Sequence, residues 1–248
     1  MLRAFHNDPA IKQFYLDRLK AHRVADEIIH GQYWKDGKGC AVGCTIHSDN
    51  HSDYETELGI PMALAYFQDK IFESLQNGAA KDFPIDFIRA IRVGADLSKV
   101  SPKFMMWLLM DKEFGVKRYV TGHSENVVRL AVDLCKRLIK GKELDREKYM
   151  EVFWFHSGWS SYAEEANALI TARAVVLTKF PEVFDNIWEW EAAAYAQRAY
   201  SINKANEAKQ AVTGPRSSIA YCIANDQAIR DWWRVARAKL LSLLKAAR

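Results

Sequence analysis

The sequence predicts an all-α protein, a compact multi-helix bundle of short to medium helices. Apolar residues recur at spacings of three and four along the long segments, as in residues 14–29 and 127–139, which is the periodicity of amphipathic helices. No alternating β-branched run lies between turn signals, so no strand is expected. Proline and glycine interrupt the chain at helix-length intervals with brief connections, which is typical of a bundle.

In the first part of the chain, proline, serine and asparagine mark helix starts and glycine marks helix ends. Asn7-Asp8-Pro9 predicts an N-cap followed by proline in the first turn, because this arrangement satisfies or omits the free N–H groups of a helix start. Glycine ends a helix because it adopts the left-handed conformation without strain. The ranges expected to be helical are 9–30, 41–46, a short helix after residue 52, 61–77, 84–94, 102–115 and 124–141.

The composition changes from about residue 146 onward. Alanine and serine form small-residue faces that alternate with tryptophan and tyrosine, and such faces let helices approach closely. Pro181 divides this region, and residues 213–216 predict a turn before the last helix. The chain is expected to form one helical domain over 1–248. A sub-domain boundary near 142–146, followed by an Ala/Ser/aromatic helical region, is equally compatible with the pattern.

The composition also restricts the cellular compartment and the binding partners that are expected for the protein. Four cysteines in 248 residues are too sparse for a disulfide scaffold, so a reducing cytoplasm is expected. No signal-peptide pattern and no run of 18 apolar residues occurs, so no membrane association is expected. The net charge of +4 is concentrated in residues 228–248, which hold six basic residues and one acid. This basic last helix is a candidate contact for nucleic acid or an acidic protein, although its leucines at helical spacing favour packing on the body.

The most unusual segment spans residues 37–55, which concentrate glycine, cysteine and histidine. Gly37-Lys38-Gly39 precedes a short expected helix over 41–46. Free N–H groups at a helix start, together with the Lys38 ammonium, suit a small anionic ligand. The alternative is a simple glycine turn. We predict that Lys38 and Gly39 contribute to a ligand site, without the spacing of a P-loop.

Cys40 is the candidate nucleophile of this segment. A thiol at the start of a helix and near Lys38 is expected to have a lowered pKa. His51 and Glu55 are the candidate acid–base partners, and His123 or His156 are alternative bases from distant segments. The competing interpretation is that Cys40 and Cys44 are small buried apolar residues.

Other residues of the segment are expected to line the ligand site. A helix that continued through residue 51 would spread its ligands over about 10 Å, too far for one metal ion. Ser52-x-x-Glu55 instead predicts a turn and a capping box, and a turn could bring Cys44, His47 and a third ligand to a metal, although no zinc spacing is present. We assign no metal and no cofactor. The expected ligand-binding residues, besides Lys38 and Gly39, are Tyr33, Trp34, Cys44, His47 and Tyr54.

Three short runs of the sequence resemble those of a known protein family. They are Gly-Lys-Gly-Cys-Ala-Val-Gly-Cys at 37–44, Leu-Gly-Ile-Pro at 58–61 and Arg-Val-Gly-Ala-Asp-Leu at 92–97. Together with the Ala/Ser/Trp-rich later helices, they resemble an uncharacterised family of bacterial and bacteriophage proteins. The resemblance spans most of the chain. It implies a microbial or phage origin and no particular activity.

Two functions from different classes follow from the sequence. The first is an intracellular microbial or phage helical protein with a small-ligand or anion-binding site at residues 33–57, in which Cys40 is the candidate nucleophile. The second is a non-catalytic helical interaction protein that acts on a host protein or on nucleic acid, with the Cys/His segment as a structural element.

Overall fold

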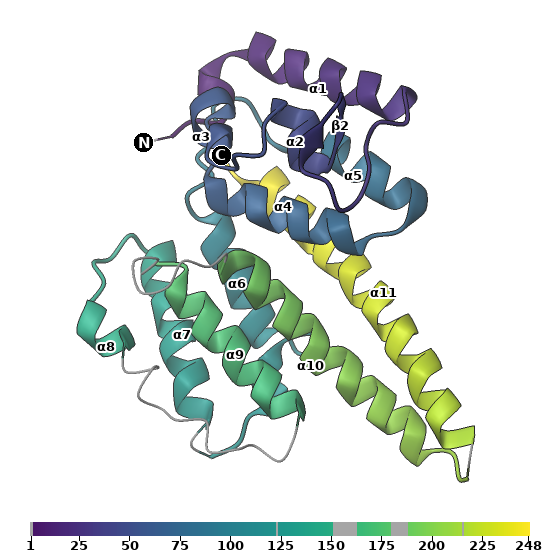
Figure 1. Ribbon diagram of the computed structural model, residues 1–248. Coiled ribbons are helices and arrows are strands. Elements are labelled where there is room, and N and C mark those ends of the chain that lie inside the picture. Colours follow the sequence, from purple (N-terminus) through teal and green to yellow (C-terminus); the bar gives the residue numbers. More distant parts are fainter. Residues whose placement is uncertain (1, 123, 151–162, 180–187, 215) are drawn as a thin grey trace. The chain divides into compact units, whose positions relative to one another are not determined.

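The computed structural model describes residues 2–122, 124–150, 163–179, 188–214 and 216–248. Over these ranges the chain is helical apart from loops and one two-stranded hairpin (Figure 1), which confirms the all-α prediction. The helices are α1 (Pro9–Val24), α2 (Ala41–Ile46), α3 (Asp53–Leu58), α4 (Met62–Ser74), α5 (Asn77–Ala90), α6 (Val100–Met110), α7 (Ser124–Ile139), α8 (Arg146–Met150), α9 (Ala163–Leu177), α10 (Trp188–Gln210) and α11 (Arg216–Ala246). The 3₁₀ turns are η1 (Ala4–Asn7) and η2 (Val116–Tyr119), and the strands are β1 (Trp34–Lys35) and β2 (Lys38–Gly39).

The chain divides into two compact units. Unit 1 comprises Met1–Ser101 together with Ala236–Arg248, and unit 2 comprises Pro102–Val235. Residues 142–146, where the sequence suggested a boundary, lie inside unit 2 between α7 and α8.

Unit 1 is built around α2, a helix of only six residues. All six of its residues are buried, and α2 contacts α1, α3, α4, α5 and β2. Figure 1 shows α1 running beside α2 and α5 in this unit. An isolated helix this short is unstable in water, so the packing of its neighbours holds α2 in place.

Unit 2 contains the Ala-rich helices, and α9 packs along α10 and against α7. The alanines of α9 and α10 are largely buried, as the small-residue pattern predicts. Aromatic rings fill the rest of this core: Trp107 lies 5.6 Å from Trp232 between ring centroids, and Phe114 lies 5.1 Å from Tyr200. Trp154 and Trp159 of the same pattern, and Pro181, lie outside the described residues.

Several expected helix boundaries are wrong, among them the end of the helix expected over 102–115, which the structure places at Met110. The first helix ends at Val24 and a loop continues to Gly31, while Asn77-Gly78 begins α5 instead of ending α4. Pro84 lies inside α5. Apolar side chains on both sides of Pro84 are buried, and this burial outweighs the backbone hydrogen bond that proline cannot make.

Candidate functional site

Cys40 is the N-cap of α2 and lies in the interior of unit 1. Its Sγ accepts a hydrogen bond from the Gly43 N–H at 3.4 Å, and its own backbone N–H donates to the carbonyls of Gln32 and Tyr33. The residue has no exposed surface. The thiol therefore faces other buried groups.

The glycines before Cys40 form a hairpin. Asp36 and Gly37 both have positive φ, 51° and 81°, and they connect β1 to β2 as a two-residue turn, the geometry for which Asp-Gly is favoured. The Gly39 N–H donates to the Glu27 carbonyl at 3.1 Å. Because the N–H groups of Gly39 and Cys40 are both satisfied by carbonyls, the expected anion cradle has no free donor at either position. Lys38 is exposed on the hairpin.

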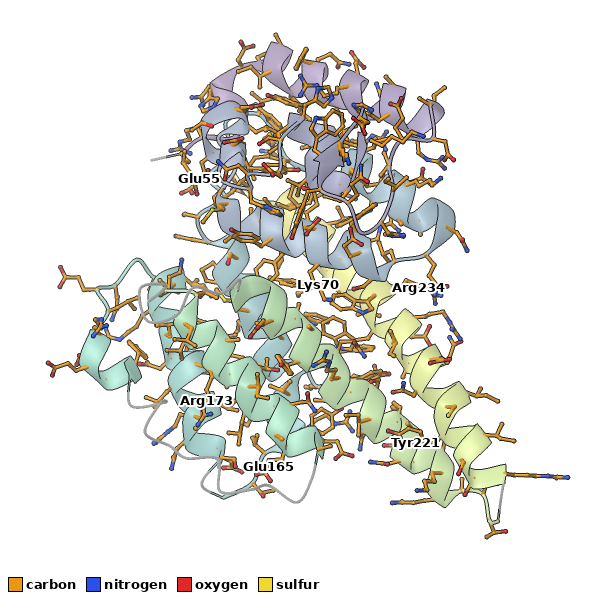
Figure 2. The ribbon with its side chains drawn as sticks, viewed as in Figure 1. Glu55, Lys70, Glu165, Arg173, Tyr221 and Arg234 are labelled. Carbon is orange, nitrogen blue, oxygen red and sulfur yellow. The ribbon has the colours of Figure 1, made fainter. Side chains whose placement is uncertain are left out.

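Helix α4 places two carboxylates beside Cys40. Asp69 and Glu73 are four residues apart and therefore share one face of the helix. One ligand atom from each of Cys40, Asp69 and Glu73 lies within 4.8 Å of the other two. The stick view locates this turn of α4 by Lys70, which is labelled there (Figure 2).

His51 adds a nitrogen to this group. Its Nε2 lies 3.7 Å from Asp69 Oδ2, beyond hydrogen-bond range. His51 Nε2 and Asp69 Oδ1 have no hydrogen-bond partner. Both residues are buried, with 6% of the surface of His51 and 3% of the surface of Asp69 exposed. Cys40, His51, Asp69 and Glu73 are called the Cys40 centre below.

Aromatic rings fix the orientation of His51. The imidazole stacks on Tyr66 with ring centroids 4.6 Å apart and an interplanar angle of 20°. Tyr33 meets the same imidazole edge-on at 5.4 Å. His51 thus contacts two aromatic rings, which restrict its imidazole at the position where Nε2 is 3.7 Å from Asp69 Oδ2.

The electrostatics of the Cys40 centre correct the expectation of a lowered cysteine pKa. Burial, and then the negative charge of Asp69, raise the pKa of the Cys40 thiol far above its ordinary value. Burial and the charge of Asp69 also raise the pKa of Glu73, although the Gly31 N–H opposes this by donating to both of its oxygens. Cys40 is therefore a neutral thiol at pH 7, because burial and then the charge of Asp69 disfavour the thiolate.

Tyr54 and Gln68 lie next to the Cys40 centre. The Tyr54 hydroxyl donates to Gln68 Oε1 at 2.8 Å in a buried contact, and the charge of Asp69 contributes to the raised pKa of Tyr54 after the larger effect of burial. The amide Nε2 of Gln68 is buried without a hydrogen-bond partner. Of the expected ligand-binding residues, Tyr33 and Tyr54 thus adjoin the Cys40 centre.

His47, Trp34 and Cys44 belong to a different part of unit 1. His47 ends α2 in the left-handed conformation with φ of 55°, so the helix does not continue, as the turn-rich sequence predicts. Its ring stacks on Trp34 and faces His22. The Cys44 thiol donates to the carbonyls of Gly39 and Glu27, and burial raises its pKa to about 12.

Glu55 does not reach the Cys40 centre. Its Oε1 accepts a hydrogen bond from the Met62 N–H at 2.9 Å, so it caps the start of α4; the residue is labelled on α3 in Figure 2. Ser52 makes no side-chain cap, so the predicted capping box is wrong. Glu55 therefore accepts from a backbone N–H of α4 and not of its own helix. This is possible because α3 ends after six residues and the chain turns at Gly59 toward α4.

The sequence analysis did not predict four residues of these sites. They are Asp69 and Glu73 of the Cys40 centre, and His22 and Glu27 near His47. The available signal was Gln68-Asp69, two polar residues at core positions of an otherwise apolar helix face, where charged residues are rarely buried without a partner. The alternative bases His123 and His156 lie outside the described residues.

The basic last helix is partly neutralised within the chain. Arg237 pairs with Asp86 at 2.5 Å and Arg234 pairs with Asp231 at 3.0 Å. Leu240 and Leu244 are fully buried. These contacts favour a packing role for this part of α11, and binding of nucleic acid or a protein through it stays a prediction.

Native alkylation of the protein is expected to modify Cys222 first. Cys222 is exposed, whereas Cys40, Cys44 and Cys135 are buried, and burial raises the pKa of Cys135 to about 12. Because the thiolate is the reactive form, the buried thiols should react at least about tenfold more slowly with iodoacetamide at pH 7. Peptide mass spectrometry after limited labelling measures the order in which the four cysteines react. Fast labelling of Cys40 would contradict the buried, neutral thiol described above.

Within the described ranges, every helix is too short or too polar to cross a membrane. Comparison with known proteins finds no matching family model, no matching curated protein and no matching solved structure.

Proposed function

We propose that unit 1 binds a divalent transition-metal ion of the zinc class at the Cys40 centre. The observation that carries the proposal is the convergence of three potential ligand atoms, from Cys40, Asp69 and Glu73, within 4.8 Å of one another. Two tetrahedral zinc ligands at about 2.0–2.3 Å from the ion are about 3.3–3.7 Å apart. The three side chains therefore need only small rotations to hold one ion.

The unpartnered buried atoms support the same proposal. Buried polar groups normally have hydrogen-bond partners, and each exception needs an explanation. Asp69 Oδ1 and His51 Nε2 are two such exceptions on adjoining side chains. A bound cation accounts for both, because it would accept the carboxylate lone pair and leave the neutral imidazole as a fourth ligand or as a donor to Asp69.

The donor set selects the class of metal. Calcium and magnesium prefer sites made only of oxygen ligands, whereas a thiolate with carboxylates and imidazole suits zinc and related ions. The cluster also has the wrong charge for an anion, because Asp69 and Glu73 would repel it. The small ligand predicted from the sequence is therefore proposed to be a cation, and its binding stays cysteine-dependent.

Binding would exchange a proton for the metal. Burial and Asp69 raise the pKa of Cys40 when no cation is present, and a thiol that coordinates a metal is deprotonated. The bond between sulfur and hydrogen breaks, the proton goes to solvent, and the sulfur lone pair binds the ion. Affinity should accordingly rise with pH, since fewer protons then compete for Cys40.

Metal content of the full-length protein, purified without a histidine tag, tests the proposal. Zinc measured by plasma mass spectrometry is expected at one ion or more per chain, and Cys40→Ser and Glu73→Gln should each lose one ion. Replacing an outer-shell partner of a metal ligand already lowers metal affinity by about 10- to 100-fold, so removing a ligand should lower it by at least about a hundredfold.

Cys135→Ser is the matched control, because Cys135 is also fully buried but lies on α7 in unit 2. It should keep the metal content of the parent protein. The proposal fails if the parent protein neither retains zinc nor binds added zinc in calorimetry, or if Cys135→Ser loses as much metal as Cys40→Ser.

A further inference from the structure

Two histidines outside the Cys40 centre point their ring nitrogens at each other. His22 lies in the last turn of α1, and His47 is the C-cap of α2. Their Nε2 atoms are 2.7 Å apart. They are called the imidazole pair below. His22 is mostly buried, with 9% of its surface exposed, whereas His47 is exposed, so solvent reaches the pair from one side.

A carboxylate and an indole hold the pair in position. His22 Nδ1 is 2.6 Å from Glu27 Oε2, and this contact places the free lone pair of a neutral His22 on Nε2. Trp34 stacks on His47 at 4.3 Å with an interplanar angle of 8° and meets His22 edge-on at 5.6 Å. Both rings are therefore oriented before any ligand arrives.

The pair has the arrangement of a metal-binding histidine cluster. A histidine that binds a metal through one ring nitrogen commonly donates its other N–H to a carboxylate, as His22 can to Glu27. The neutral imidazole is the ligand form, and burial, Arg18 and His22 lower the pKa of His47, which favours that form.

We propose that the imidazole pair binds a second divalent transition-metal ion, of the zinc and nickel class, independently of the Cys40 centre. Two nitrogens at about 2.05 Å from a tetrahedral ion lie about 3.3 Å apart. The two Nε2 atoms now share a hydrogen bond, so they must separate by about 0.6 Å and each ring must turn until its lone pair points at the ion instead of at the other nitrogen. Water on the exposed side of His47 would complete the coordination.

Calorimetric titration of the full-length Cys40→Ser protein with zinc chloride tests the pair alone. One binding event is expected in this background. His22→Gln and His47→Asn, added separately, should weaken it at least about tenfold; asparagine is chosen because residue 47 has positive φ, which asparagine tolerates. His30→Gln is the matched control, since His30 is in the same unit and contacts the Phe72 carbonyl instead.

Nickel provides a second measurement that reports position. A paramagnetic ion at His47 should quench the emission of stacked Trp34, so nickel chloride should lower fluorescence in the Cys40→Ser protein but not after Trp34→Phe. Circular dichroism of each variant confirms that it folds.

Zinc binding that survives both histidine substitutions, or an absence of any binding in the Cys40→Ser protein, would overturn the proposal and leave the pair as a hydrogen bond between two imidazoles. Because the Cys40→Ser background lacks a ligand of the Cys40 centre, failure here does not affect the proposed function. A Cys40→Ser protein that keeps the metal content of the parent protein would rule out the Cys40 centre and leave the imidazole pair, whereas a parent protein that binds no zinc at all would rule out both.

Discussion

Replacing Gly43 with alanine is expected to destabilise the protein by about 3 kcal/mol. A Cβ at this position of α2 would lie 1.6 Å from the Tyr33 carbonyl oxygen and 2.6 Å from its carbon. Both are backbone atoms of the segment that enters the hairpin, so no side-chain rotation relieves the clash. The helix and the hairpin would have to separate.

That separation would also disturb the Cys40 centre. The Cys40 N–H donates to the Gln32 and Tyr33 carbonyls at 2.6 and 3.1 Å, and both bonds join α2 to the hairpin segment. Gly43→Ala should thus reduce metal binding as well as stability, although residue 43 offers no ligand atom. Equilibrium unfolding in urea and zinc calorimetry measure the two effects.

Gly78→Ala is the matched control in the same unit. Gly78 lies in α5, and the nearest atoms to its added Cβ are at 3.9 Å in Arg23 and 4.0 Å in Asp82, which are ordinary contacts. Alanine has the higher helix propensity, so this variant should be unchanged or more stable by about 0.5 kcal/mol. A Gly43→Ala protein as stable as Gly78→Ala would show that α2 does not pack on the hairpin as described.

The sequence predicts the helices because their signals are local. Apolar spacing and N-caps act within a few residues, so α2 is predicted at its observed bounds and α7 close to them. The hairpin had a local signal too, in Asp36-Gly37. The Asp36-Gly37 signal did not lead to a predicted hairpin, because β1 and β2 have only two residues each. Two residues are too few to show an alternating pattern.

The candidate site was predictable only in part, because its residues come from separate segments. Cys40 and His51 stand out by residue type within residues 37–55. Only the packing of α4 against α2 shows that Asp69 and Glu73 face Cys40. The direction of the Cys40 pKa depends on the same contact, since Asp69 is the neighbour that raises it after burial. Lys38, two residues before Cys40 in the sequence, is not among the groups that shift this pKa.

Asp69→Asn is expected to abolish the stabilisation that metal binding at the Cys40 centre gives and, in the metal-free protein, to raise stability by about 1 kcal/mol. Asp69 is 3% exposed and one of its oxygens has no hydrogen-bond partner. Taking a charge out of water without satisfying it is costly. A neutral amide of the same shape reduces that cost and is a poor ligand for zinc.

The parent protein should respond to metal in the opposite way. Ligand that binds only the folded state stabilises it by about 2.7 kcal/mol when its free concentration is roughly a hundredfold above Kd. Thermal unfolding with zinc or with a chelator measures this difference. In a His47→Asn background, which removes a ligand of the imidazole pair, the midpoint of Asp69→Asn should be the same in both conditions and should exceed that of the chelated protein that keeps Asp69.

Asp86→Asn distinguishes loss of a ligand from the general effect of removing a carboxylate. Asp86 is paired with Arg237 and Arg89, so its replacement leaves a partly buried guanidinium with weaker partners. This change should lower stability and leave the zinc response intact. If Asp69→Asn instead lowers the stability of the chelated protein as Asp86→Asn does, then Asp69 is a structural partner in the core. In that case its unpartnered oxygen no longer supports a metal site. If the chelated protein gains stability while the zinc response is lost, a buried charge has been kept at residue 69 at the expense of stability, and binding a cation is the function that explains it.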